Sequence, residues 1–516
     1  MLRAPGRFPF RAAGVALLVL GAAACGGKSA IAPTPATGTP PSATAPPTAT
    51  PLPVGELGDA LRPGRAADLR FAQDLQYHIR AQVDPAAASV SGSEDVRWVN
   101  RTGAPRDALV FRLYANLPYN GADMQVTAAR VGGRAVTPLL SPSRTVLRVP
   151  LDPPLADGGT AEVALDFRLH LPATSSEGYN LFHADPHLVT LVSWYPQVAP
   201  YRAGGWFTDD APPDGDQVFS QAGGYLVELR VPRGFRVWGS GAPLPGDGST
   251  LRYAAAPVRD FFAIVADSYQ EVSRTTGDGV RITVATSPEL RAAAEQALDL
   301  AADIMTYFER RFGPYPYRRL VIVEGPVTAG GVEWPMAVEL PGGVFTRGGP
   351  SLGFTLAHEL AHQWWYGVVG DNQVDEPWLD EPFANYSALR WYEDRHPDAF
   401  AALEGAIVLN PYRGIEGTAA DLPINLPVAA YPTEKEYARV VYGKGAYFLQ
   451  QLEQQVGATV FERALQTYYR AEMYRVTSGA AFRSAVQSAC GCDLSGLFDR
   501  FLAPPPATIG TPPAAR

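Results

Sequence analysis

The sequence HELAH occupies residues His358–His362, and WLDEPFANY follows at residues Trp378–Tyr386. The first stretch lies in a helix-favouring segment, so His358 and His362, four positions apart, are expected on one helical face. Two imidazoles on one face can bind one tetrahedral zinc ion, with Glu359 beside the open fourth position. The spacing predicts a catalytic metal site, and the alternative is a chance match in a surface helix.

A third metal ligand is expected from the second stretch. Glu381 follows His362 after eighteen intervening residues, and Pro382 suits the first turn of a helix, where its missing N–H group would have no partner anyway. A carboxylate on the next helix completes a His₂Glu site with one open position. We therefore predict one zinc ion per chain, bound by His358, His362 and Glu381, with Glu359 as the general base. The alternative for Glu381 is a helix-capping carboxylate.

The N-terminal residues have the features of an export signal. Arg3, Arg7 and Arg11 precede a short apolar run, residues 12–20, which is too short to span a bilayer. Cys25 follows three alanines and precedes two glycines, a pattern that resembles a bacterial lipoprotein processing site. We predict a signal peptide at residues 1–24 and a lipid anchor on Cys25, which would make the protein a cell-membrane lipoprotein facing away from the cytoplasm. Plain secretion after an Ala-x-Ala cleavage is the alternative.

Segments of low complexity flank the part of the chain that is expected to fold. Residues 32–53 are almost wholly Pro, Thr, Ala, Ser and Gly, and residues 504–516 have a similar composition. Such segments cannot bury enough apolar surface to offset the entropy of ordering. We expect an extended linker at residues 25–64, a disordered tail at residues 504–516, and two or three domains between them.

Composition narrows the possible partners. The 516-residue chain has a net charge of -9, which disfavours a nucleic-acid surface because such a surface needs basic residues. Apart from Cys25 the only cysteines are Cys490 and Cys492, so the fold is not stapled by disulfides. Whether these two thiols are bonded to each other is left open by the sequence.

The two halves of the folded part have different periodicities. Residues 163–171 and 225–231 alternate apolar and polar positions, as does the shorter run 109–113, and this period indicates half-buried strands. We predict an antiparallel β domain at residues 65–273. After residue 285 apolar residues recur every three or four positions up to Phe312, and Gly313 and Pro314 end that helix.

The second half is expected to contain a strand-bearing lobe and then a helical lobe, at residues 274–503. A strand is predicted at residues 320–323 and further helices near residues 442–455, 458–470, 478–488 and 494–502. The fold class is therefore a multidomain α+β protein.

Four motifs in the same order resemble those of the aminopeptidase N family of gluzincin zinc metallopeptidases. The HELAHQWW block and WLDEPFANY resemble HExxHxW and WLNEGFA of that family, with the same gap of eighteen residues. GGVEW at residues 330–334 resembles its GAMEN exopeptidase motif, and YGKG at residues 442–445 resembles its YxKG segment. The resemblance extends to the first half of the chain, at residues 111–116, 194–196 and 259–261. It implies a saddle-like β domain followed by a thermolysin-like catalytic domain.

The resemblance also implies roles for individual residues. It assigns the binding of the substrate's free α-ammonium to Glu333, with Gly330 and Gly331 allowing close approach of the peptide, and stabilisation of the oxyanion to Tyr442. The implied activity is an aminopeptidase that hydrolyses the N-terminal bond of peptides outside the cytoplasm by a zinc-activated water. A C-terminal helical domain, present in many relatives, is not expected here, so the cleft is predicted to be open and long peptides to be trimmed as efficiently as short ones.

Two other functions remain possible from the sequence. A catalytically silent binding module on the same fold would not need to retain the ligands, the base and the tyrosine, all of which are present. A zinc hydrolase acting on internal or non-peptide bonds is the other alternative, against which Glu333 argues. His183 and His187 are also four apart, but Pro186 separates them and no glutamate follows His183, so we interpret them as loop histidines of the β domain.

Overall fold

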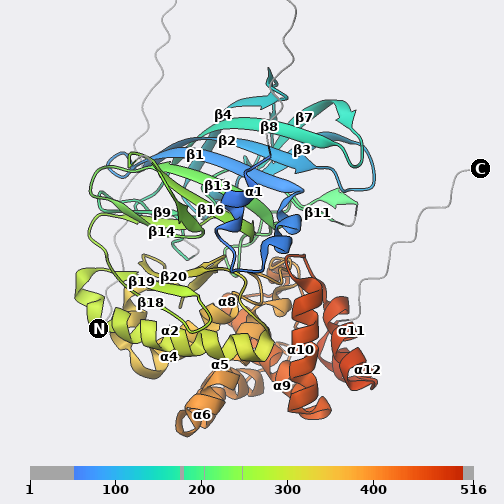
Figure 1. Cartoon of the computed structure of the whole chain (residues 1–516). Helices are drawn as coiled ribbons and strands as arrows, with labels where there is room; N and C mark the ends of the chain where they lie inside the picture. Colours follow the sequence, from blue (N-terminus) through green and yellow to red (C-terminus); the bar gives the residue numbers. More distant parts are fainter. Residues whose placement is uncertain (1–50, 175–178, 203, 247, 504–516) are drawn as a thin grey trace, which may run out of the picture. The chain divides into compact units, whose positions relative to one another are not determined.

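The computed structural model describes residues 51–174, 179–202, 204–246 and 248–503. Strands fill the first half of these residues, and most helices lie in the second half (Figure 1). The predicted export signal, Cys25 and the tail at residues 504–516 lie outside the described ranges. Within those ranges no helix combines the length and the apolar character that a membrane crossing requires.

The first half forms a β domain of four sheets in the described residues. Its largest sheet has eight strands in the order β15-β16-β13-β1-β2-β8-β4-β5, and the smaller ones are β10-β3-β7-β6, β14-β17-β9 and β11-β12. The strands are β1 (Leu75–Asp84), β2 (Ser89–Val99), β3 (Arg106–Arg112), β4 (Asp123–Val131), β5 (Arg134–Ala135), β6 (Leu139–Leu140), β7 (Val146–Leu155), β8 (Thr160–His170), β9 (Leu188–Leu191), β10 (Gln197–Val198), β11 (Tyr201–Arg202), β12 (Gly205–Trp206), β13 (Gly223–Arg230), β14 (Arg236–Gly239), β15 (Ala242–Leu244), β16 (Leu251–Val258) and β17 (Ala263–Ala266).

The strands predicted from alternation are present as β3, β8 and β13, and their apolar positions face the core. In β8 the burial alternates along the strand, with Val163, Leu165, Phe167 and Leu169 buried. One pairing differs from the predicted antiparallel arrangement, because β1 pairs with β13 in parallel, from Gln76 opposite Gly224 onward. A parallel pair needs a long crossover, and here the whole of β2 to β12 supplies it.

The catalytic half begins with a mixed five-stranded sheet in the order β18-β19-β20-β22-β21. Its strands are β18 (Gln270–Thr275), β19 (Arg281–Thr286), β20 (Arg319–Gly325), β21 (Val332–Trp334) and β22 (Ala337–Pro341). Residue 273, where the sequence predicts a domain boundary, lies within β18. β21 is an edge strand that pairs only with β22, and it carries Glu333.

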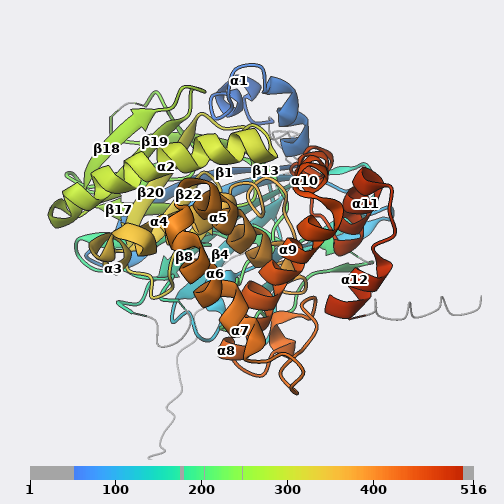
Figure 2. The same ribbon diagram turned by 90° about the horizontal axis from the view of Figure 1, so that it is seen from below.

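Helices make up most of the remaining chain, and Figure 2 shows them from below. The long predicted helix and the four C-terminal ones are α2, α9, α10, α11 and α12, with boundaries within three residues of those predicted. The helices are α1 (Val54–Gly58), α2 (Arg291–Phe312), α3 (Gly342–Arg347), α4 (Gly349–Ala361), α5 (Glu381–Arg395), α6 (Pro397–Glu404), α7 (Asn410–Arg413), α8 (Glu434–Tyr437), α9 (Gly445–Val456), α10 (Ala458–Glu472), α11 (Gly479–Cys490) and α12 (Ser495–Phe501). Shorter segments are the π-helices Gly405–Leu409 and Ala438–Lys444 and the 3₁₀-helices Ala66–Ala72, Tyr114–Asn116, Pro288–Leu290, Pro377–Leu379 and Val428–Ala430.

Helix α2 and helix α4 determine how the catalytic half is layered. The apolar face of α2 packs on β18 and β19 and, further along, on α4, which in turn packs against α5 and the edge strand β21. Phe308 and Phe312 of α2 contact the ring of Trp364, just after α4. This packing fixes α4 between the sheet and α5, and both of the predicted metal-binding stretches lie at that position.

Two features at the ends of the described chain go beyond the sequence analysis. The predicted linker extended to residue 64, but Leu52, Leu57 and Leu61 are buried, and α1 packs against β13 and β16. The spaced leucines of this segment supply apolar surface that the residues before it lack. At the other end Cys490 and Cys492 form a disulfide around Gly491, which adopts the left-handed conformation that ends α11.

A buried arginine joins the β domain to the catalytic half. Arg259 is fully buried and donates hydrogen bonds to the carbonyl oxygens of Tyr366 (2.9 Å), Ser220 (3.2 Å) and Arg475. Gly370 leaves the space for its guanidinium, since a Cβ atom there would lie 1.8 Å from Cζ of Arg259. A buried charge is tolerated only when its hydrogen bonds are satisfied, so this contact depends on both domains being in place.

We expect the Gly370→Ala substitution to lower the free energy of unfolding by about 2–4 kcal/mol, because the added methyl group displaces the Arg259 guanidinium from its carbonyl partners. Thermal melting followed by circular dichroism measures the change. Gly496→Ala is the matched control, since nothing lies within 4 Å of a Cβ atom at that helical position. Equal melting temperatures for Gly370→Ala and the unmodified protein would contradict this account of the interface.

Candidate metal centre and peptide-binding cavity

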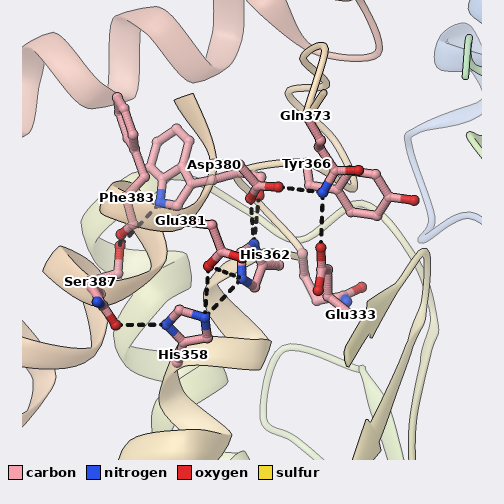
Figure 3. Close-up of polar contacts among 12 residues, drawn as sticks. Glu333, His358, His362, Tyr366, Gln373, Asp380, Glu381, Phe383 and Ser387 are labelled. Carbon is pink, nitrogen blue, oxygen red and sulfur yellow. Dashed lines mark hydrogen bonds and ion pairs between the residues drawn. The ribbon is translucent and has the colours of Figure 1, made fainter. Parts of the chain in front are cut away.

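The three predicted metal ligands converge in the structure. His358 lies in the last turn of α4, His362 caps that helix, and Glu381 is the first residue of α5. The Nε2 atoms of the two histidines are 3.1 Å apart, and Oε2 of Glu381 lies 3.1 Å from His358 Nε2 and 3.5 Å from His362 Nε2. Figure 3 shows the two rings and the carboxylate pointing toward one another.

Hydrogen bonds on the far side of each ring determine which nitrogen is free. Nδ1 of His358 lies 2.9 Å from Oδ1 of Asn385, and Nδ1 of His362 contacts a carboxylate oxygen of Asp380. Both partners accept hydrogen bonds, so each Nδ1 atom carries a proton and Nε2 is the nitrogen of each ring that can bind a metal. A divalent cation placed among the two Nε2 atoms and the carboxylate oxygen of Glu381 would contact all three. The donor set therefore fits zinc, and Asn385 and Asp380 orient the ligands.

Glu359 lies inside the same cavity without being part of the ligand set. Its side-chain atoms approach the backbone of Gly331 so closely that a Cβ atom there would lie 2.5 Å from Oε1 of Glu359. A ligand atom of Glu359 lies within 4.8 Å of ligand atoms of Glu333 and His362. Burial raises the pKa of Glu359 well above its usual value, although the charge of His362 opposes this rise. Any side chain at position 331 would collide with Glu359, so the position of the predicted general base requires glycine there.

Glu333 is held in the middle of the edge strand β21, in the cavity that also contains the metal ligands His358 and Glu381. Its Oε1 atom accepts a hydrogen bond of 3.0 Å from Nε2 of Gln373, and the same amide donates to Asp380 (Figure 3). Burial raises the pKa of Glu333 to about 8, the charge of His362 opposes the rise, and the carboxylates of Asp380 and Glu381 add to it. A cation bound beside Glu333 would reverse this effect by stabilising the ionised form.

Asp216 of the β domain completes this acidic group, and the sequence analysis did not identify it. Ligand atoms of Asp216, Glu333 and Asp380 lie within 4.8 Å of one another. Burial raises the pKa of the Asp216 carboxyl well above its ordinary value, and the nearby charges of Glu333 and Glu381 add to the rise. Its loop, PDGDQ at residues 213–217, carries no periodic or motif signal, so no feature of the sequence pointed to it. So many carboxyl groups in one buried cavity favour binding of cations.

Tyr442 is brought to the metal ligands by a π-helical segment. The sequence predicted an ordinary helix from about residue 442, but residues Ala438–Lys444 are π-helical and α9 follows. The Tyr442 hydroxyl donates a hydrogen bond to Oε1 of Glu381, and its backbone carbonyl accepts one of 3.1 Å from Asn385. A π-helix widens the turn and commonly occurs at functional sites, where it redirects a side chain.

A cavity of about 500 Å³ connects these residues. Its lining includes Gly330, Gly331, Glu333, Glu359 and Tyr442, so the structure brings all the residues predicted for substrate binding and catalysis to one place. Tyr437 is a further lining residue that the sequence analysis missed. Its side chain is buried, and its hydroxyl has no hydrogen-bond partner in the part of the chain that the structure describes. This hydroxyl is available to a bound peptide.

His183 and His187 lie in the β domain, away from the metal centre, as predicted. His183 contacts Asp185, and Nδ1 of His187 lies 2.8 Å from a carboxylate oxygen of Asp267. Neither histidine belongs to any group of metal-binding side chains found among the described residues.

Comparisons with known proteins agree with this geometry. Residues 351–501 match the model of the peptidase family M1 domain, a segment that contains all three metal ligands, Glu359 and Tyr442. This segment is therefore similar to the M1 peptidase domain, in agreement with the aminopeptidase N family motifs in the sequence.

Relatives of known function match only part of the chain. The protein is 27% identical over 251 residues to probable aminopeptidase 1 of Sulfurisphaera tokodaii, and this match covers 44% of the chain and 30% of that protein. It is 25% identical over 252 residues to endoplasmic reticulum aminopeptidase 1 of Homo sapiens, covering 45% of the chain and 26% of that protein. The matches thus span less than a third of the length of these two relatives.

Solved structures share the fold over most of the chain. An M1 zinc metallopeptidase of Deinococcus radiodurans aligns with a TM-score of 0.62 at 20% identity, covering 89% of this chain and 100% of that chain. A mutant of an M1 zinc metallopeptidase from the same organism, bound to a Tyr-Ser-Ala substrate, aligns with a TM-score of 0.63, also at 20% identity, over 87% and 99% of the two chains. The arrangement of a sheet-rich region followed by a helical domain is therefore that of a known architecture.

We expect purified protein to contain one zinc ion per chain by elemental mass spectrometry. His362→Ala should abolish stoichiometric zinc, Asn385→Ala should weaken zinc affinity about 10- to 100-fold through loss of ligand orientation, and Glu359→Gln should retain the metal. Loss of zinc in Glu359→Gln to the same degree as in His362→Ala would contradict the distinction between ligand and base.

Proposed function

We propose that the protein is a zinc-dependent aminopeptidase that removes the first residue of peptides with a free N-terminus. The observation that carries the proposal is the position of Glu333. Its carboxylate belongs both to the acidic group with Asp216 and Asp380 and to the group with Glu359 and His362. An ammonium bound by Asp216, Glu333 and Asp380 would bring only the first peptide bond of a substrate to Glu359 and His362.

The peptide itself can be held by backbone groups. β21 is the last strand in its sheet, so one edge of it has no neighbouring strand among the described residues. An extended peptide can add to such an edge, and Gly330 and Gly331 leave no side chains in its way. The amine anchor on β21 and the peptide then share one strand, which fixes the distance from the ammonium to the scissile bond.

The metal and the base have separate tasks in this mechanism. When bound by His358, His362 and Glu381, zinc supplies Lewis acidity that lowers the pKa of a water from its bulk value to about 7. Glu359 accepts the proton of the attacking water and returns it to the leaving nitrogen as the C–N bond breaks. The products are a free amino acid and a peptide shortened by one residue.

Tyr442 and Asp380 assist without taking part in proton transfer. The hydroxyl of Tyr442, beside Glu381 in the cavity wall, can donate a hydrogen bond to the negative oxygen that develops on the scissile carbonyl. Asp380 keeps His362 in the tautomer that binds metal and, through Gln373, holds Glu333 in place. The ammonium anchor and a metal ligand are thus linked through Gln373 and Asp380.

We also propose that the enzyme acts outside the cytoplasm, tethered by a lipid on Cys25. The proposal rests on the export signal in the sequence, and the disulfide between Cys490 and Cys492 is consistent with it because disulfides persist in oxidising compartments.

A chelator should abolish the hydrolysis of aminoacyl fluorogenic amides, and added zinc should restore it. Glu359→Gln should lower kcat about 10²- to 10⁴-fold, the range typical of a general base, with zinc still bound. Rates are measured on the same preparations whose zinc content is known. Activity that is indifferent to the chelator, or full turnover in Glu359→Gln, would refute the proposed chemistry.

Glu333→Gln should raise KM for peptides with a free amine and lower kcat/KM about 10- to 100-fold, because the variant loses a charge-assisted contact to the ammonium. N-acetylated peptides of the same sequence provide the control, and any residual cleavage of them should change much less. Equal losses on free and acetylated peptides would exclude the role of Glu333 as the amine anchor.

A further inference from the structure

Two basic side chains line the peptide cavity and have no assigned role. Lys435 lies on α8 and is exposed, and Arg439 lies on the π-helical segment and is half-buried. They are the only lysine and arginine in the cavity wall, and neither forms a salt bridge or a side-chain hydrogen bond with any residue in the ranges that the structure describes. Glu434 also lines the cavity, but it forms no salt bridge with Lys435, because adjacent residues of a helix point in different directions.

Lys435 and Arg439 line the same cavity as the predicted oxyanion donor, Tyr442. Lys435 lies on α8, and Arg439 and Tyr442 lie on the π-helical segment that follows directly. Even at the rise of an α-helix, about 1.5 Å per residue, Lys435 lies no more than roughly 10 Å along the axis from Tyr442. An extended peptide rises about 3.3 Å per residue, so the two cations extend over about three residues of a substrate that is cut beside Tyr442.

We propose that Lys435 and Arg439 bind a carboxylate of the substrate on the leaving side of the first peptide bond. This inference rests on the proposed aminopeptidase function. The carboxylate is either an acidic side chain in the second or third residue or the C-terminus of a dipeptide or tripeptide. The first residue is not its source, because that residue lies among the carboxylates of Asp216 and Glu333, which repel another negative charge.

The test compares peptides that differ only in one carboxylate. One pair is Leu-Gly-Gly with a free C-terminus and the same tripeptide as its C-terminal amide. The other pair is Leu-Asp-Gly amide and Leu-Asn-Gly amide. The ratio of kcat/KM within each pair is measured for the unmodified protein, for the double variant Lys435→Gln with Arg439→Gln, and for Arg413→Gln. The last variant is the matched control, because Arg413 is exposed on the neighbouring α7 and does not line the cavity.

The unmodified protein and the Arg413→Gln control should prefer the carboxylate in at least one pair by about three- to tenfold, the size expected for charge-assisted contacts that are partly exposed to solvent. In the double variant that ratio should fall to about one. A preference only within the Leu-Gly-Gly pair identifies the C-terminus as the ligand, and a preference only within the aspartate pair identifies the side chain. Ratios near one for the unmodified protein, or a preference that survives in the double variant, overturn the proposal.

A binding measurement separates this inference from the proposed function. If the unmodified protein hydrolyses neither amide, the aminopeptidase proposal fails. Titration calorimetry of the same four peptides with the Glu359→Gln variant, with and without the two glutamine substitutions, then gives the ratio of dissociation constants within each pair. The same three- to tenfold preference, lost in the variant that lacks both cations, supports the carboxylate site, and its absence refutes it.

Discussion

Hydrogen bonds on the outer nitrogens of two imidazoles constrain the rest of the site. Asn385 and Asp380 accept these bonds, so the inner nitrogens of His358 and His362 are the ones left to bind a metal, and they lie only 3.1 Å apart. This arrangement is maintained because α4 is fixed between the sheet and α5. Glu381, at the first position of α5, adds a negative charge at the same point. The fold thus holds three donor atoms of a metal site in place.

Carboxyl groups also gather in the part of the cavity where a substrate would bind. Asp216 comes from the β domain, Glu333 from an edge strand and Glu359 from a helix, and the charge of Glu333 raises the cost of ionising both of the others. Zinc compensates part of this charge, and a substrate ammonium can compensate more. Arg259 helps to position Asp216, because it binds the carbonyl oxygen of Ser220, which lies four residues after Asp216. The junction of the domains therefore helps to hold a residue of the cavity.

Much of the fold and most of the site could be predicted because their determinants are local. The HELAH spacing places two ligands by helix geometry alone, and Pro382 marks the start of the helix that presents Glu381. Regular periodicity likewise identified α2 and the four C-terminal helices. Side chains whose position depends on distant contacts were not predicted. The parallel pairing of β1 with β13 follows from a long crossover that no window of sequence reveals, and the burial of Leu57 follows from surfaces on β13 and β16.

Asp216 and Tyr437 illustrate this limit at the site itself. A Cβ atom on Gly215 would lie 3.1 Å from the Tyr437 hydroxyl, so the loop of the β domain and the helical lobe meet at the cavity wall although more than two hundred residues separate them. Neither residue belongs to a periodic pattern, and an aspartate directly after a glycine is equally typical of an ordinary turn. Their significance comes only from what surrounds them: a group of buried carboxyls for Asp216, and a buried hydroxyl without a partner in the described residues for Tyr437. In this protein the metal ligands follow from the spacing of residues along the chain, whereas the shape of the substrate cavity follows from the way the two domains pack.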